Sequence, residues 1–229
     1  AVQVTLLNFT PAPEKTVYMA ARLCYSADAI KELEGKAGGA SLEKFLGRIL
    51  SMGHLSVLEH ASFTFGIEGV SRALTHQLVR HRLASYSQQS QRYVIAASPD
   101  YVTPATIEGD PEKKKRYDRT VKQVYKLYKE LVDAGVPAED ARYILPNAAC
   151  SKIIVTMNAR ELIHFFRLRC CERAQWEIRD MATRMLVLAK GTSPFIFKDA
   201  GPACVKGACS EGGMTCGRPK EIKEKFRKL

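Results

Sequence analysis

The sequence has little that would place the protein in a membrane or in a disulfide-bonded secreted class. No apolar run approaches the roughly 20 residues that cross a bilayer. The first residues, AVQVTLLNFTPAPEK, lack the basic start and the small-residue cleavage site of a signal peptide. The seven cysteines, an odd number that includes the adjacent Cys170 and Cys171, fit free thiols in a reducing compartment. We therefore expect a cytoplasmic protein with no membrane partner.

Metal-binding patterns are also scarce. Cys204, Cys209 and Cys216 lie in the glycine-rich stretch GPACVKGACSEGGMTCG. Their spacing is wider than that of paired CxxC knuckles, and no nearby histidine completes four ligands. Zinc binding is the alternative, but we expect no metal site. We expect one main domain over residues 1–200, followed by a loosely ordered tail over residues 201–229 that is rich in glycine and cysteine and basic at its end.

Negative charge is in short supply. Lysine and arginine number 35 against 24 aspartates and glutamates, which gives a formal net charge of +11. Anionic partners such as nucleotides, phosphates or nucleic acid are therefore favoured. Part of the excess lies in runs typical of solvated surface, EKKKR at residues 112–116 and KEIKEKFRKL at the end. The 46% apolar content in 229 residues suffices for a full core.

Hydrophobic periodicity predicts both strands and helices. Strands are expected at residues 2–9, 61–70 and 150–158, and helices at 14–26, 41–54, 71–81, 113–135, 137–146, 159–170 and 174–191. Ser41 should cap one helix, and Asn158 with Glu161 should form a capping-box-like pair at another. Because few regular βαβ units occur, we predict an α+β fold with a mixed sheet and long helices.

The stretch RHRLASYSQQSQR, residues 80–92, follows the helix expected at 71–81 and is read as a loop. It gathers three arginines, a histidine and many hydroxyl and amide groups. Arginine forks match phosphate and carboxylate oxygens, so a phosphate-binding loop is one interpretation. A solvated basic loop, or one paired with acidic residues, is the other, and composition leaves both open. Gln77 and Arg80, three residues apart, should share one helix face.

A second constellation lies in the helix expected from Ala159. Arg160, His164 and Arg167 recur at i, i+4 and i+7 and form a basic stripe, opposite an apolar face of Leu162, Phe165 and Phe166. Such a stripe is usually the solvated side of a helix. Arg169 falls about half a turn away from Arg160 at about 100° per residue, so it should serve a different ligand.

These motifs together resemble the flavin-dependent thymidylate synthases. Residues 80–92 are similar to the RHR-type signature of that family. The similarity continues in GHLSVLEH at 53–60, NARELIHFFRLR at 158–169, AQWEIR at 174–179 and GP at 201–202. Several separated motifs in the family's order are far more specific than one.

The resemblance implies a methyltransferase that converts dUMP to dTMP in de novo thymidylate biosynthesis. It implies FAD as cofactor, NADPH as the reductant of the flavin, 5,10-methylenetetrahydrofolate as one-carbon donor, and no covalent enzyme-cysteine intermediate. Residues 1–200 become the catalytic domain, in a homotetramer whose active sites lie where subunits meet. No nucleic-acid partner is expected on this reading.

Site residues are carried over by position. Those matching the FAD site are Ser56, Arg80, His81, Arg82, Gln88, Asn158, Arg160 and His164. Those matching the dUMP site are Gln77, Leu78, Val79, Arg80, Gln88, Gln89, Ser90, Gln91, Arg92, Arg142 and Arg169. Arg169 matches the family's activating arginine and is the one predicted catalytic residue, because a fixed guanidinium stabilises charge that builds on the pyrimidine.

Some positions depart from the family pattern. Ser87 and Gln88 stand where many relatives have asparagine and glutamate, and we interpret the glutamine as a tolerated hydrogen-bonding substitute. His164 replaces a common asparagine and is held less firmly than Arg160, whereas His54 could shape the folate or nicotinamide side or be structural. Ser90 has no adjacent histidine to activate it as a nucleophile.

Two other functions stay open. A nucleic-acid-binding module would use the positive charge and the tyrosines near arginine, Tyr86 and Tyr93. A flavoprotein NADPH oxidase would bind flavin without depending on a uracil nucleotide.

Overall fold

The structure is a computed structural model that describes residues 2–96 and 98–229. The chain forms two compact units. Ile67–Arg80 and Tyr86–Ile154, with the few residues before Val4, make up the first unit. Val4–Gly66, His81–Ser85 and Val155–Leu229 make up the second unit. Among the described helices, none combines the length and the apolar character that crossing a membrane requires.

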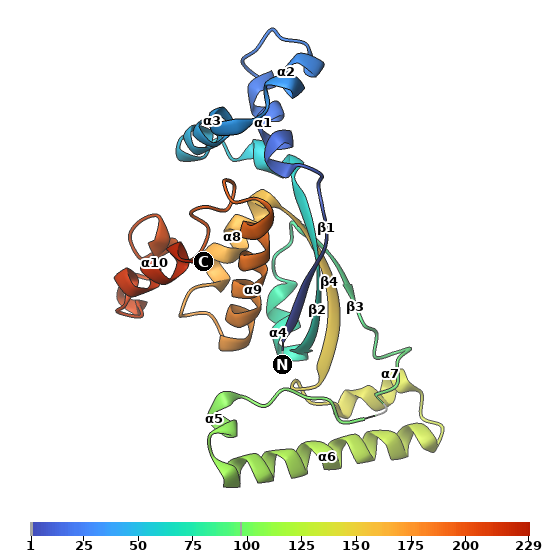
Figure 1. The fold of residues 1–229 in the computed structure, drawn as a ribbon. Coiled ribbons are helices and arrows are strands. Elements are labelled where there is room, and N and C mark those ends of the chain that lie inside the picture. The colour runs from blue at the N-terminus through green and yellow to red at the C-terminus, as the bar shows by residue number, and fades with distance from the viewer. Residues whose placement is uncertain (1, 97) are drawn as a thin grey trace. The chain divides into compact units, whose positions relative to one another are not determined.

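One four-stranded sheet runs in the order β1-β2-β4-β3 (Figure 1). Its strands are β1 Gln3–Phe9, β2 Ser62–Ser71, β3 Ala84–Gln88 and β4 Cys150–Asn158. β2 alternates as predicted, with Phe63, Phe65 and Ile67 all buried. The α+β class is confirmed, but the sheet is antiparallel where a mixed sheet was expected.

Strand β3 corrects the prediction of a loop over residues 80–92. Its sequence, ASYSQ, contains no large aliphatic side chain, so hydrophobic periodicity could not reveal it. The strand lies at the edge of the sheet beside β4, where backbone pairing supplies the hydrogen bonds and side chains need not be buried.

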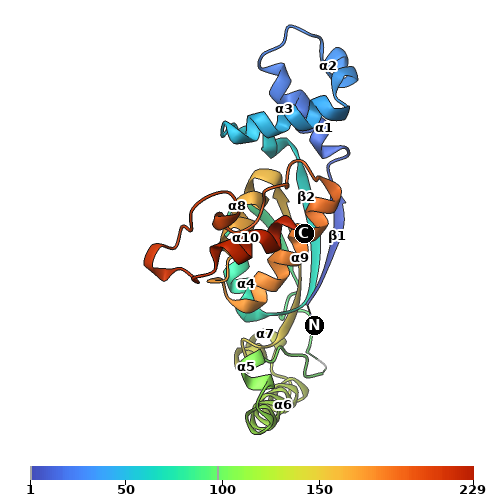
Figure 2. The same cartoon turned by 60° about the vertical axis from the view of Figure 1, so that its left-hand side comes forward.

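The first unit is dominated by a long helix. It contains α4 Arg72–Leu78, α5 Ala105–Glu108, α6 Pro111–Asp133, α7 Ala138–Ala141 and the 3₁₀ turn η2 Arg142–Ile144. Helix α6 is seen nearly end-on in Figure 2. Asp110 caps it by accepting hydrogen bonds from the backbone N–H groups of Glu112 and Lys113. Tyr125 joins α6 to the segment that precedes α5, since its hydroxyl donates a hydrogen bond to the Asp100 carbonyl at 2.8 Å.

The second unit is helical around an aromatic core. It contains α1 Pro13–Leu23, α2 Ile30–Lys36, α3 Gly39–Ser51, η1 Ser56–His60, α8 Ala159–Arg169, α9 Trp176–Thr192, η3 Ala203–Val205, η4 Gly212–Met214 and α10 Pro219–Arg227. The ring of Phe197 packs edge-on against Phe63 of β2 and Phe166 of α8 at centroid distances of 5.3 and 6.0 Å. The apolar face predicted for α8 is therefore confirmed as the core-facing side.

Three local predictions are wrong. Helix α3 begins at Gly39, and Ser41 lies inside its first turn with its hydroxyl donating to the Gly38 carbonyl. Helix α4 ends at Leu78, so Arg80 lies beyond the helix and does not share a helix face with Gln77. Asn158 caps α8 as expected, but the Glu161 side chain turns away from it, to His81.

The C-terminal segment is ordered, which corrects the expectation of a loose tail. Ile222 and Phe226 of α10 are buried at 3% and 1% exposure, and Lys190 donates to the Phe226 carbonyl at 2.8 Å. Gly201 adopts a φ of 146°, and a Cβ there would stand 3.0 Å from the Phe226 ring. Only glycine allows this close approach, so the tail packs on the second unit through side chains that sequence periodicity did not single out.

Candidate active site

In the first unit, Gln88 holds two hydroxyl groups at the end of β3. Its amide nitrogen donates to Ser151 Oγ at 2.9 Å and to Thr75 Oγ1 at 3.2 Å. Thr75 in turn donates to the Arg72 carbonyl at 3.0 Å, which leaves its hydroxyl oxygen as the acceptor. An amide donor suits this position, because a carboxylate could only accept hydrogen bonds. Gln88 thereby joins β3, β4 and α4 within the unit.

Two arginines predicted to bind the nucleotide, Arg92 and Arg142, both contact Glu139. Arg92 Nε donates to the Glu139 carboxylate at 2.8 Å, and Arg142 Nε donates to the Glu139 backbone carbonyl at 3.1 Å. Ser90 lies inside the same segment, where its hydroxyl accepts from the Arg92 N–H at 3.1 Å. The Arg92–Glu139 pair is about half exposed, so an anion of higher charge could compete for Arg92.

Arg72 adds a third cation to this group. Burial lowers its pKa from the usual value, and the nearby charge of Arg142 lowers it further. An arginine in the first turn of a helix also opposes the helix dipole. A bound anion would relieve these unfavourable interactions. The sequence signal that could have identified Arg72 is an arginine at the start of a helix, where the helix dipole favours an acidic residue.

The other residues predicted to bind the nucleotide differ in burial and in their hydrogen-bond partners. Leu78 is fully buried, and its carbonyl accepts from the Tyr86 hydroxyl at 2.9 Å. Gln77 donates to the Ala73 carbonyl of its own helix at 3.3 Å, and Gln89 continues the pairing of β3 through its N–H to the Lys152 carbonyl at 2.9 Å. Val79 and Arg80 are exposed and Gln91 is half-buried. The bonds described for Gln77, Leu78 and Gln89 therefore hold the helix and the strand in place.

In the second unit, three side chains form a relay of hydrogen bonds, in which His81 and Glu161 are buried and Arg169 is half-buried. Arg169 Nε donates to His81 Nε2 at 3.0 Å, and His81 Nδ1 lies 3.1 Å from the Glu161 carboxylate. The side chains of His81 and Glu161 are 4% and 7% exposed. The ring of Phe165 packs edge-on against His81 at 4.9 Å. The predicted catalytic arginine is therefore positioned by an imidazole that is itself held on both sides.

The hydrogen bonds determine the state of His81. Arginine is always protonated and can only donate, so Nε2 of His81 must carry no proton. Nδ1 then carries the proton and donates it to Glu161. Burial lowers the pKa of His81 below its usual value of 6.5; the hydrogen bond to Glu161 opposes this and the charge of Arg169 adds to it. Neutral His81 is thus held by Glu161, and in turn holds the guanidinium of Arg169 in a fixed orientation.

The exposed face of α8 carries two of the other residues predicted for flavin binding. Arg160 and His164 are exposed, as their helical spacing predicted, and Arg160 pairs with Glu59 of η1 at 2.5 Å. Ser56 begins η1, which packs against α8. Asn158 Oδ1 accepts from the Glu161 N–H at 2.9 Å, so it shapes the helix start. Arg82 is exposed and makes no hydrogen bond or ion pair with another described residue.

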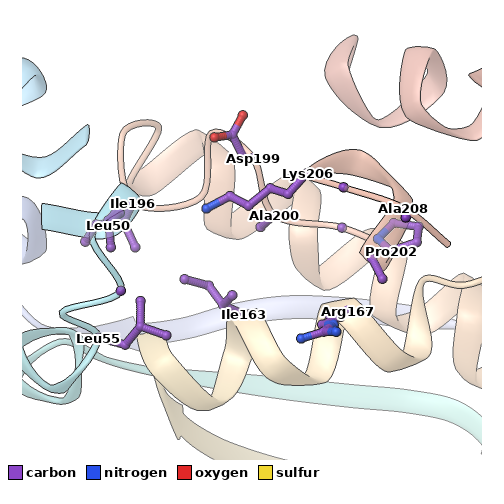
Figure 3. A pocket seen from close by; sticks show the side chains of 14 residues that line it. Leu50, Leu55, Ile163, Arg167, Ile196, Asp199, Ala200, Pro202, Lys206 and Ala208 are labelled. Atoms are coloured by element: carbon purple, nitrogen blue, oxygen red, sulfur yellow. The ribbon is translucent and has the colours of Figure 1, made fainter. Parts of the chain in front are cut away.

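A cavity of about 470 Å³ lies in the second unit, where Ile163 and Arg167 of α8 form part of its lining (Figure 3). Leu50, Leu55, Ile163 and Ile196 give it apolar walls. Three charged side chains also line it, Arg167 from α8, Asp199 from the segment after α9, and Lys206 from the tail. This volume is within the range of sites that bind organic ligands, and two cations near apolar walls suit an anionic group on an apolar body. Of the tail residues that line it, sequence reasoning had singled out only Gly201 and Pro202, as a family motif with no assigned role.

The predicted site residues therefore divide between the units. The residues predicted for the nucleotide lie in the first unit, apart from Arg169. Those predicted for FAD lie in the second unit, apart from Arg80 and Gln88. Glu161, Thr75 and Ser151 were missed as supporting residues, because their roles depend on contacts between segments far apart in the chain.

Comparison with known proteins gives consistent matches over nearly the whole chain. The family model described as thymidylate synthase complementing protein matches residues 5–195. The flavin-dependent thymidylate synthase of Geobacter sulfurreducens is 57% identical over 230 residues, covering 100% of this chain and 99% of the relative. The enzyme of the same name from Pyrococcus furiosus is 47% identical over 238 residues, covering 100% and 98%.

A solved structure supports the fold. The UMP/dUMP methylase PolB from Streptomyces cacaoi, bound with 5-Br dUMP, matches with a TM-score of 0.77 at 24% identity, over 86% of this chain and 93% of that chain. At this identity the likeness concerns the fold alone.

Proposed function

Because the chain belongs to the thymidylate synthase complementing protein family, that of the flavin-dependent thymidylate synthases, we propose that it methylates dUMP to dTMP. The one-carbon donor is 5,10-methylenetetrahydrofolate. FAD, reduced by NADPH, supplies the hydride that completes the methyl group. The enzyme acts in de novo thymidylate biosynthesis in the cytoplasm, a location supported by the free state of all seven cysteines.

The observation that carries the proposal is the relay from Glu161 through His81 to Arg169. Methylation at C5 requires electron density to build on the uracil ring, and a fixed guanidinium stabilises the resulting charge on N3 and O2. Arg169 is held by its Nε, which fixes the orientation of the guanidinium. Cys170, the next residue, is fully buried and is not presented as a nucleophile. Activation by Arg169 therefore replaces a covalent thiol.

The donor set fits a nucleotide and a flavin, both of which carry phosphates. In the first unit, Arg72, Arg92 and Arg142 form a cationic group whose mutual repulsion a phosphate dianion would offset. In the second unit, Arg82, Arg160 and His164 present exposed basic groups, and Ser56 contributes a hydroxyl. We assign the first group to dUMP and the second, with His81, Asn158 and the first unit's Arg80 and Gln88, to FAD.

The cavity of Figure 3 is assigned to the folate. Gly53 and Leu55 of its wall flank His54, and Arg167 with Lys206 would pair with the folate's carboxylates. Replacing both cations, as in Arg167→Ala with Lys206→Ala, should raise the KM for methylenetetrahydrofolate and leave that for dUMP nearly unchanged. Equal increases for the two substrates would contradict the assignment.

The active assembly is proposed to be a homotetramer. Arg160 and Arg169 point from opposite sides of α8, so one helix could serve two sites in an assembly. Light scattering coupled to size-exclusion chromatography measures the mass directly, and a monomeric mass under assay conditions would contradict this proposal.

The reaction itself is tested by anaerobic incubation of the full chain with FAD, NADPH, methylenetetrahydrofolate and dUMP, followed by chromatography for dTMP. We expect product that disappears when either flavin or folate is omitted. NADPH consumption without dTMP would identify an oxidase instead. Salt-sensitive binding of nucleic acid without a bound chromophore would favour the nucleic-acid-binding alternative.

A further inference from the structure

Four cysteines far apart in the sequence line one small cavity in the second unit. Cys204, Cys209 and Cys216 come from the C-terminal segment, and Cys171 comes from the turn between α8 and α9. The cavity has a volume of about 10 Å³. This is the space of about one water-sized sphere, which suits a single ion and excludes an organic ligand.

The backbone on both sides of the three tail cysteines is anchored. η3, which contains Cys204, packs against α10. Gly201 before it and Phe226 after it are in close approach, and Ile222 of α10 lines the same cavity. Gly212 and Gly217 adopt positive φ angles of 51° and 76°, which lets the intervening chain turn back. The loop that carries Cys209 and Cys216 is therefore anchored at both ends, and its two cysteines line the same cavity as Cys171.

The thiols at the cavity outnumber its two carboxylates, of which Glu172 is already held by two arginines. Glu172 pairs with Arg179 at 3.3 Å and with Arg218 at 3.5 Å. Glu211 accepts a hydrogen bond from the Ser210 hydroxyl at 3.3 Å. All four cysteines are free and partly accessible. Arg218 adds positive charge beside a site that would carry four thiolates.

We propose that Cys171, Cys204, Cys209 and Cys216 form a structural zinc site that fastens the C-terminal segment to the turn between α8 and α9. A set of four sulfurs is the ligand set of tetrahedral zinc or of iron–sulfur centres, and the volume for one ion favours zinc. Binding Zn²⁺ forms four S–Zn bonds and releases four thiol protons to solvent, with no change of oxidation state. The fourth ligand, absent from the tail itself, comes from Cys171.

The site is not preformed. Among the described residues, no three histidine, cysteine, aspartate or glutamate side chains are placed together so that they could hold a metal ion as they stand. Ligation therefore requires the sulfurs to turn toward the cavity, a rotation about χ1 that is open to loop side chains. Zinc should draw the sulfurs together and order the tail further.

The test uses the full chain, reduced and stripped of metal by a chelator, and titrated anaerobically with Zn²⁺ and with Co²⁺. We expect one metal ion per chain by native mass spectrometry. The cobalt form should show sulfur-to-metal charge-transfer bands and the visible bands of tetrahedral coordination. Alkylation mapping should find Cys171, Cys204, Cys209 and Cys216 protected by zinc and Cys24 still reactive.

Variants separate the site from incidental binding. Cys171→Ser should weaken zinc binding by more than about 100-fold, the upper end of the cost of losing a ligand's outer partner. Cys24→Ser, at an exposed thiol elsewhere in the second unit, should leave zinc binding unchanged. If Cys171→Ser does not fold by circular dichroism, Cys209→Ser serves in its place. No stoichiometric zinc, or unchanged affinity in the folded variant, would overturn the proposal.

Discussion

At the scale of single residues, Arg169 shows how a predicted role acquires a physical basis. Its position half a turn from Arg160 indicated only that the two serve different ligands. The structure shows what the sequence left open, namely that Arg169 is oriented by a neutral, buried His81. Catalysis by charge stabilisation depends on such fixed orientation, because a donor that must reorganise contributes less.

Arg169→Ala should abolish methyl transfer while flavin remains bound. Removing a preorganised donor costs about 100- to 1,000-fold in kcat, and we expect a loss at or beyond this range. Flavin absorbance measures retention of FAD, and dTMP chromatography measures turnover. Arg184→Ala is the matched control, since Arg184 pairs with Asp180 on the exposed side of α9. Turnover of Arg169→Ala close to that of the control would remove its assigned role.

Glu161→Gln should reduce turnover by acting through His81. Without the carboxylate, the His81 ring is free to exchange its tautomer, and in the other tautomer Nε2 cannot accept from Arg169. The cost is expected at about 10- to 100-fold in kcat, as for loss of an outer partner of a ligating group. The ¹⁵N NMR shifts of His81 report the tautomer directly. An unchanged tautomer together with reduced turnover would show that Glu161 does not act through His81.

At the scale of elements, the C-terminal helix is a structural part of the second unit. Phe226 fills the space that Gly201 leaves open, and the backbone of α10 receives a hydrogen bond from Lys190 of α9. The tail residues also line both the folate-assigned cavity and the four-cysteine cavity. The stability of α10 is therefore coupled to two candidate sites.

Phe226→Ala should destabilise the protein by about 3–5 kcal/mol, the cost of removing a fully buried phenylalanine and leaving a cavity. Chemical denaturation monitored by circular dichroism measures the change. Glu224→Ala on the exposed side of α10 is the control and should change the free energy of unfolding by less than about 0.5 kcal/mol. Equal stability of the two variants would mean that α10 does not pack as described.

At the scale of the whole molecule, buried His81 makes stability depend on pH. Its pKa is lowered in the folded state, so the unfolded chain binds the proton more readily. Stability is then fully present above the unfolded value near 6.5 and is lost as pH falls from there toward the lowered folded value. The charged or titratable groups facing His81 are Glu161, Arg169 and His164.

The free energy of unfolding should therefore fall with decreasing pH below about 6.5, by up to about 1.4 kcal/mol for each pH unit. Urea unfolding across this range measures the slope. His81→Gln should flatten it, whereas His76→Gln, at an exposed position of α4, should keep it. A slope that is the same in both variants would assign the effect to other groups.

Local patterns in the sequence were enough for much of the fold and for the family. Alternation identified β1 and β2, and β-branched residues identified β4. Helical spacing identified α6, α8 and α9, and the separated motifs identified the flavin-dependent thymidylate synthases. These features succeed because each depends on neighbours within one or two turns of helix or one strand.

Tertiary structure decided what depends on distant segments. Edge strand β3 exists because β4 supplies its hydrogen bonds, and Glu161 turns from a local cap to His81, which is 80 residues away in the chain. The ordered tail and the approach of Cys171 to three tail cysteines have the same origin. Periodicity records which face of an element is buried, but only packing decides which polar or sulfur-bearing side chains meet there.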